Sequence, residues 1–157
     1  MKKKFILVVF AALSLALVQA FAAQSGSKGT NNADLRKLSG ETLVLHVGTS
    51  AFTVSLYDNP TAKDLLSKLP LKLKAEDYAG YDEKLIRLNN ALSMEGAPRG
   101  DEPLFPEVGY YHPGRWIALY YGPIGYWSGK VPLGKIDASI EQLAAIPDNA
   151  PVTLDVK

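Results

Sequence analysis

Short segments in which apolar and polar residues alternate recur through the sequence from residue 42 onward, and this pattern most constrains the fold. In the segment 42–47, apolar residues occupy every second position from Leu43 to Val47. In the segment 52–56, the same spacing runs from Phe52 to Leu56. A period of two places one set of side chains on a buried face and the other set outward, which is typical of β-strands. The short connection at residues 48–51 predicts that the two strands form a hairpin.

The rest of the chain predicts more strands and two short helices. Leucines alternate with lysines at residues 71–74, and further strands are expected at residues 84–88, 109–112, 115–121, 131–136 and 152–156. Asn59 can cap a helix that begins at Pro60, and Ser139 can cap a second one with Gln142 as its capping-box partner. The buried face of this second helix is expected to hold Ile140, Leu143 and Ala144. These elements predict a mainly β fold, a closed or nearly closed barrel of about eight strands with two short helices.

The N-terminus has the three parts of an export signal. Lys2, Lys3 and Lys4 precede the apolar run 5–18, and Ala20-Phe21-Ala22 has small residues where signal peptidase reads the chain. The run is short for a membrane span, although an uncleaved N-terminal anchor remains the alternative. We therefore predict a signal peptide at residues 1–23, a flexible polar tether at 24–37 and a barrel domain at 38–157. The protein is expected to be periplasmic or secreted, without a membrane span after signal removal.

Composition excludes several classes of function. The sequence has no cysteine, so it forms no disulfide and has no thiolate metal site or cysteine nucleophile. Its 17 basic and 16 acidic residues nearly balance, which offers no electrostatic footprint for nucleic acid. His46 and His112 lack partners at metal-ligand spacing, and residues 122–126 do not match a phosphate-binding loop. Neither a metal nor another cofactor is expected.

Several blocks of the sequence resemble a bacterial cyclophilin-like domain family. The most specific is Tyr57-Asp58-Asn59-Pro60-Thr61-Ala62 within the segment 52–62. The later blocks follow in order: Leu69-Pro70-Leu71, Asp77-Tyr78-Ala79-Gly80, Glu95-Gly96-Ala97-Pro98, Gly109-Tyr110-Tyr111 and Leu133-Gly134-Lys135-Ile136-Asp137. The resemblance covers residues 43–156 and implies a small β-barrel with two helices, like the barrel of cyclophilin prolyl isomerases. It implies little about chemistry, because this branch is mostly of unassigned function.

The isomerase motifs themselves are missing. Cyclophilins carry Phe-His-Arg and Gln-Gly-Gly-Asp-Phe segments that line the proline pocket, and neither string occurs here. An isomerase needs a donor aimed at the prolyl nitrogen, because weakening of the amide resonance lowers the rotation barrier. None of the four arginines after the signal lies in that context. Prolyl isomerisation is the one enzyme class that the resemblance suggests, and the sequence favours a protein that is not an enzyme.

Aromatic residues are concentrated between residues 110 and 127, where seven of 18 positions are Tyr or Trp. Tyr121, Tyr126 and Trp127 flank a loop rich in Gly and Pro, and we expect them to be exposed. Aromatic rings with polar tips suit the binding of peptides, sugars or flat small molecules. The alternative is that these rings only pack against the barrel.

A long loop at residues 95–103 contributes the fourth candidate residue. Arg99 is its single cation and suits a carboxylate on a ligand. In the alternative, Arg99 pairs with Asp101 or Glu102 in a solvated loop. The adjacent acids at 82–83 and 101–102 are likewise expected to be solvated.

The sequence thus supports three hypotheses. The first is an exported, non-catalytic barrel that binds an unknown small molecule or peptide through Arg99, Tyr121, Tyr126 and Trp127. The second is a weak peptidyl-prolyl isomerase or periplasmic folding helper. The third is an accessory interaction domain of another envelope protein.

Overall fold

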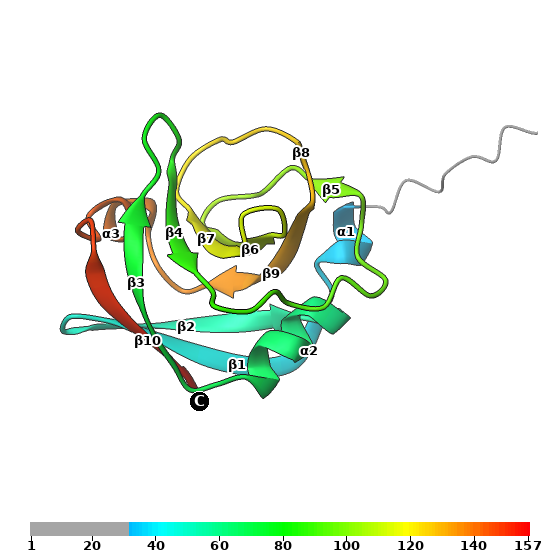
Figure 1. The fold of residues 1–157 in the computed structure, drawn as a ribbon, viewed down its shortest axis with the longest axis horizontal. Coiled ribbons are helices and arrows are strands. Elements are labelled where there is room, and N and C mark those ends of the chain that lie inside the picture. The colour runs from blue at the N-terminus through cyan, green and yellow to red at the C-terminus, as the bar shows by residue number, and fades with distance from the viewer. Residues whose placement is uncertain (1–31) are drawn as a thin grey trace, which may run out of the picture.

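Eight antiparallel strands close into a barrel in a computed structural model that describes residues 32–157 (Figure 1). Their order around the barrel is β1-β10-β3-β4-β7-β6-β9-β2. The bounds are β1 (Leu38–Val47), β2 (Ser50–Tyr57), β3 (Leu71–Asp77), β4 (Glu83–Arg87), β6 (Glu107–Tyr111), β7 (Trp116–Tyr120), β9 (Lys130–Ile136) and β10 (Ala150–Val156). This confirms the predicted fold class. The predicted signal peptide and most of the tether lie outside the described residues.

The alternation read from the sequence sets which side chains fill the barrel. Leu43, Leu45 and Val47 of β1 are buried, whereas His46 is exposed. Leu43 pairs with Val54 across the β1–β2 hairpin, so the apolar faces of the two strands meet in one core. The hairpin and its phase are as predicted.

Two helices are capped as predicted. Helix α2 (Pro60–Ser67) has Asn59 as its N-cap, whose side-chain oxygen accepts a hydrogen bond from the Ala62 backbone N–H at 2.8 Å. The Asn59 amide also donates to the Pro132 carbonyl at 2.9 Å and so fastens α2 to β9. Helix α3 (Ile140–Ala144) begins with the Ser139–Gln142 capping box.

The predicted buried face of α3 is wrong at two of its three positions. Leu143 is buried, but Ile140 and Ala144 are exposed. The helix has only five residues, and Leu143 is its single buried residue. Ile146 joins Leu143 in the core from just beyond the helix end.

Three short elements were not predicted. Helix α1 (Asn32–Leu35) lies within the segment that the sequence assigned to the tether. Strands β5 (Gly100–Asp101) and β8 (Trp127–Ser128) pair with each other outside the barrel (Figure 1). In the part of the chain that the structure describes, no helix has the length and hydrophobicity needed to cross a bilayer.

Candidate functional site

A second cluster of buried residues lies on the outer face of the barrel, separate from the main core. It contains Leu85 of β4 and Trp116, Ala118 and Tyr120 of β7. Ile124, from the segment between β7 and β8, packs against it. Side chains alternate along a strand, so these residues face away from Ile117 and Leu119, which fill the barrel. Tyr78 and Tyr111 pack against the cluster as well, and Trp127 of β8 lies over the neighbouring Lys130.

Polar residues form a row across this outer face. Glu83 of β4 is the register partner of Tyr120 on β7, and Tyr120 is in turn the partner of Glu107 on β6. All three are buried. Three acidic or phenolic groups in neighbouring strands need partners, because burial of an uncompensated polar group is costly.

Lys130, the first residue of β9, compensates Glu83. Its Nζ donates to Glu83 Oε2 at 3.2 Å, and both side chains are at most 1% exposed. The ammonium lies 4.7 Å from the Tyr120 ring centroid and 4.5 Å from that of Trp127, within range of cation–π attraction. Burial raises the pKa of Glu83 and lowers the pKa of Lys130, and the attraction between the two charges opposes both shifts. The result is a buried acid–base pair held between two aromatic rings.

The aromatic cover over this pair centres on Trp127. Its ring centroid lies 5.1 Å from that of Tyr81, 5.4 Å from Tyr111 and 6.3 Å from Tyr78, in edge-to-face contacts. Tyr78 and Tyr81 stack on each other. Trp127 is half-buried and Tyr81 is 39% exposed, so the outer rim of the cluster reaches solvent.

Within residues 32–157, three buried polar atoms in this region have no hydrogen-bond partner. They are Glu83 Oε1, Tyr120 Oη and Trp116 Nε1. The Tyr120 ring lies so close to β6 that a Cβ on Gly109 would come within 2.7 Å of its Cε2 atom, so glycine is needed there. Burial and the nearby charge of Glu83 raise the pKa of Tyr120 well above its ordinary value. The phenol is therefore a neutral donor without an acceptor.

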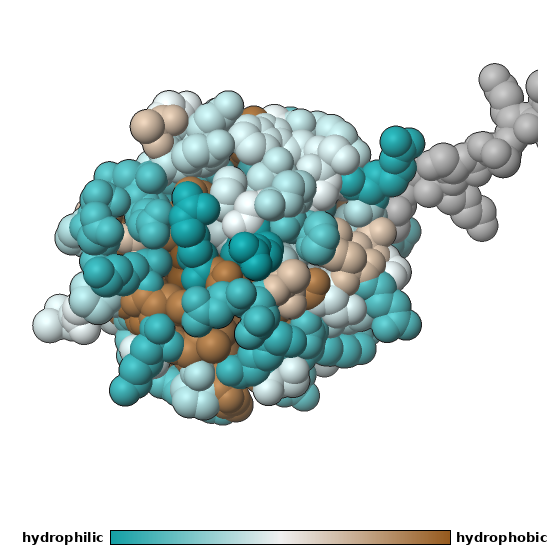
Figure 2. Space-filling view, in the orientation of Figure 1, coloured by the Kyte–Doolittle hydropathy of each residue, from teal (hydrophilic) through white to brown (hydrophobic). Residues whose placement is uncertain are grey.

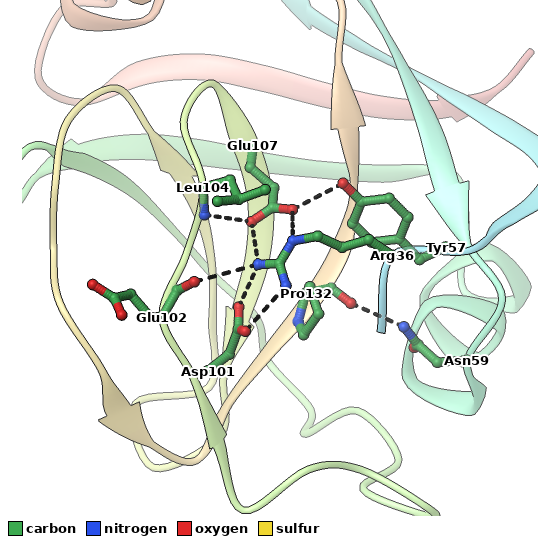
Figure 3. Close-up of polar contacts among 8 residues, drawn as sticks. All are labelled: Arg36, Tyr57, Asn59, Asp101, Glu102, Leu104, Glu107 and Pro132. Atoms are coloured by element: carbon green, nitrogen blue, oxygen red, sulfur yellow. Dashed lines mark hydrogen bonds and ion pairs between the residues drawn. The ribbon is translucent and has the colours of Figure 1, made fainter. Parts of the chain in front are cut away.

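A second buried polar network adjoins the first (Figure 3). The Arg36 guanidinium donates to Glu107 Oε1 and Oε2 at 2.8 and 2.9 Å, and to Asp101 Oδ1 and Oδ2 at 3.2 and 2.8 Å. Glu107 also accepts from the Tyr57 hydroxyl at 2.8 Å and from the Leu104 backbone N–H at 2.9 Å. Burial raises the pKa of Glu107, and the bonds from Arg36 and Tyr57 oppose that rise. Glu107 raises the pKa of Arg36, which keeps its charge.

Strand β5 joins the two networks. Asp101 pairs with Arg36 through its side chain and is the register partner of Trp127 through its backbone. The Arg99 carbonyl accepts from the Gly129 backbone N–H at 2.7 Å and from the Ser128 hydroxyl at 3.2 Å. The segment around residue 36 thus holds β5 against the barrel, and β5 holds β8 and Trp127 over the Lys130–Glu83 pair.

The structure brings three of the four predicted site residues together. Arg99 and Tyr126 are exposed and directly precede β5 and β8, the strand pair that contains Trp127. Tyr126 lies against Gly100, where a Cβ would be 2.6 Å from its hydroxyl oxygen. Tyr121 packs beside the main core instead, and its hydroxyl donates at 3.5 Å to the carbonyl of Tyr81, whose ring contacts Trp127.

The expectation that the paired acids are solvated is wrong for one member of each pair. Glu83 is fully buried and Asp101 is 6% exposed. Asp101 pairs with Arg36 rather than with Arg99. If the strand predicted at residues 84–88 began one residue earlier, its alternation would place Glu83 on the same face as Leu85. No local pattern indicated Arg36, Glu107 or Lys130.

The two histidines are both exposed, as expected for surface or turn positions. Within residues 32–157, no group of three His, Cys, Asp or Glu side chains is arranged to hold a metal ion.

The fold and this outer face define a small closed antiparallel barrel that carries a buried polar and aromatic layer on its outside. The chain belongs to the cyclophilin-like family, whose model matches residues 45–155. A solved structure of a hypothetical protein from Archaeoglobus fulgidus has the same fold, with a TM-score of 0.63 and 22% identity over 77% of this chain and 98% of that one. Comparison with curated proteins gives no match. The family and the shared structure establish the barrel and assign no reaction to it.

Proposed function

We propose that this chain is an exported domain, periplasmic or secreted, that binds a small ligand or a peptide without transforming it. The proposed site is the outer face of β4, β7 and β9 beneath Trp127. The observation that supports it is the set of unpartnered buried atoms, Glu83 Oε1, Tyr120 Oη and Trp116 Nε1. An unpaired buried polar atom costs about 1–3 kcal/mol, so three of them on one outer face favour a bound group that supplies the missing hydrogen bonds.

The residues suggest the chemistry of the ligand. Glu83 Oε1 accepts a hydrogen bond, and the Tyr120 hydroxyl both donates and accepts. The rings of Trp127 and Tyr81 favour a planar or apolar surface. Arg99 at the exposed rim suits a carboxylate. We therefore expect a planar molecule or peptide with a donor group that reaches Glu83.

Binding is favoured over reaction because the two charged groups at the centre neutralise each other. Lys130 and Glu83 form a direct ion pair, so neither is a free base or nucleophile. Export rests on the N-terminal pattern of the sequence, which lies outside the described residues.

A pair of tyrosine-to-phenylalanine variants tests the site. Tyr120→Phe removes a hydroxyl without a partner, so we expect unchanged or higher stability together with weaker ligand binding. Tyr110→Phe is the matched control, because the Tyr110 hydroxyl accepts a structural hydrogen bond from the Leu92 N–H at 3.1 Å. Its loss should lower stability by about 1 kcal/mol and leave affinity unchanged.

The ligand is sought by screening small planar compounds and short peptides with tryptophan fluorescence, which reports on Trp116 and Trp127. Each binder is then tested against Tyr120→Phe, Trp127→Ala and Arg99→Ala by calorimetry. If the affinity of the binder is the same for all three variants, the proposed site is wrong.

A further inference from the structure

Strands β3 and β4 are neighbours in the barrel but pair over only part of the length of β3. Ala75, Glu76 and Asp77 of β3 pair with β4, whereas residues 71–74 pair with β10 alone. The β3–β4 pairing ends at Ala75 and Ile86, whereas the β4–β7 pairing continues to Leu88, whose N–H donates to the Arg115 carbonyl. Along residues 71–74 the edge that faces away from β10 thus has no strand partner among the described residues.

A groove opens where the two strands separate. It has a volume of about 270 Å³ and is lined by Lys68, Leu71, Leu73, Leu88, Asn89 and Asn90. Leu71 and Leu73 are half-buried and rest against the main core. Figure 2 shows a hydrophobic area on this face of the molecule, over β3, with hydrophilic side chains around it.

The same stretch carries positive charge on its other side. Lys72 and Lys74 alternate with the leucines, so they point to the opposite face of β3, and both are exposed. Neither lysine makes an ion pair among the described residues. A free strand edge therefore presents apolar side chains on one face and two unpaired ammonium groups on the other.

We propose that the edge of β3 at residues 71–74 docks an extended segment of a partner protein in which acidic and apolar residues alternate. Every second residue of an edge strand turns its N–H and C=O outward, and these groups would pair with the backbone of the added strand. The apolar side chains of the partner would enter the groove beside Leu71, Leu73 and Leu88. Its acidic side chains would lie across from Lys72 and Lys74, where opposite charges stabilise the pairing. This surface is distinct from the site beneath Trp127.

Charge selects this partner over two other occupants. A second copy of the chain would bring its own Lys72 and Lys74 against the same lysines, and like charges across strands are destabilising. The chain's own segment at residues 24–31, Gln-Ser-Gly-Ser-Lys-Gly-Thr-Asn, has neither an acidic nor a large apolar side chain to offer.

The test uses a blocked peptide in which glutamate and valine alternate. In an NMR titration of the mature protein, we expect the largest amide shifts at residues 71–74, with slower hydrogen exchange there. Reversal of both charges with Lys72→Glu and Lys74→Glu should weaken binding by roughly tenfold or more, because two favourable cross-strand pairs become repulsive. A lysine–valine peptide should bind that variant better than the unmodified protein.

Two controls separate docking from general attraction. The double variant Lys135→Glu and Lys157→Glu has the same net charge but leaves β3 intact, and it should bind the glutamate–valine peptide as the unmodified protein does. A peptide N-methylated at every residue has no backbone N–H to donate along either edge, so it cannot extend the sheet and should not bind. The proposal is overturned if the peptide does not bind, if the shifts map elsewhere, or if both charge variants weaken binding equally.

Discussion

Arg36 holds two buried carboxylates, so its removal should be among the most costly single substitutions in the domain. The guanidinium bonds both oxygens of Glu107 and both oxygens of Asp101, and the three side chains are at most 9% exposed. Loss of one partner from a buried ion pair leaves an uncompensated charge and costs about 3–5 kcal/mol. Arg36→Ala should lower the free energy of unfolding by that amount near neutral pH. A typical domain has only about 5–15 kcal/mol in total.

The cost should depend on pH in a direction that the structure fixes. Burial already raises the pKa of Glu107, and Arg36→Ala removes the bonds that oppose this rise. A carboxyl whose folded-state pKa lies above its unfolded value stabilises the fold while it is protonated. That contribution is lost as pH rises through the folded-state pKa. The loss in free energy of unfolding caused by Arg36→Ala should therefore be largest at about pH 8 and smaller at about pH 5.

Urea denaturation followed by tryptophan fluorescence measures this deficit at each pH. Arg87→Ala is the matched control, because Arg87 pairs with Glu76 on the surface, where both side chains are at least 36% exposed. It should cost about 1 kcal/mol or less, with little pH dependence. Glu107→Gln in the Arg36→Ala background should recover part of the loss, because it removes the unpaired charge. If Arg36→Ala costs no more than Arg87→Ala, or if its cost does not change with pH, the buried network does not stabilise the fold as argued.

Three other predictions follow from the fold and the sequence. Leu56→Ala should cost about 2–5 kcal/mol in denaturant melts and Ser55→Ala less than about 1, since Leu56 fills the barrel; equal losses would show that the strand phase is wrong. Mass spectrometry of the mature protein should find a start near Ala23 or Gln24, and a full-length product held in the membrane would contradict export. The protein should not accelerate cis–trans exchange of a proline peptide; acceleration that one arginine substitution abolishes would favour the isomerase hypothesis.

Much of the barrel could be predicted from local patterns. The alternation from Leu43 to Val47 and from Phe52 to Leu56 indicated which side chains of both strands face the core. In a strand with one buried face, apolar residues must recur at every second position. The helix caps at Asn59 and Ser139 could be predicted for a similar reason, because an N-cap side chain bonds a backbone N–H only three residues further along the chain. The exposed ends of α3 were misread because a short helix has too few residues to define a face.

The site was only partly readable. Composition made Arg99, Tyr126 and Trp127 candidates, as aromatic and cationic residues on loops rich in Gly and Pro. The residues beneath them were missed because adjacent acids in a loop-like sequence are usually solvated. The row of Glu83, Tyr120 and Glu107 arises only from the register of three strands.

The sequence by itself determined which segments form the strands of the barrel, which of their side chains face the core, and where α2 and α3 begin. Each of these depends on residues a few positions apart. The tertiary structure alone decided that Arg36 meets Glu107, 71 residues away, and that Lys130 meets Glu83, 47 residues away. These pairs depend on the strand order β4-β7-β6-β9 and on the β5–β8 pair outside the barrel. The alternation of apolar and polar residues within a strand is the same for any order of the strands. It therefore does not show which charged side chains are buried together.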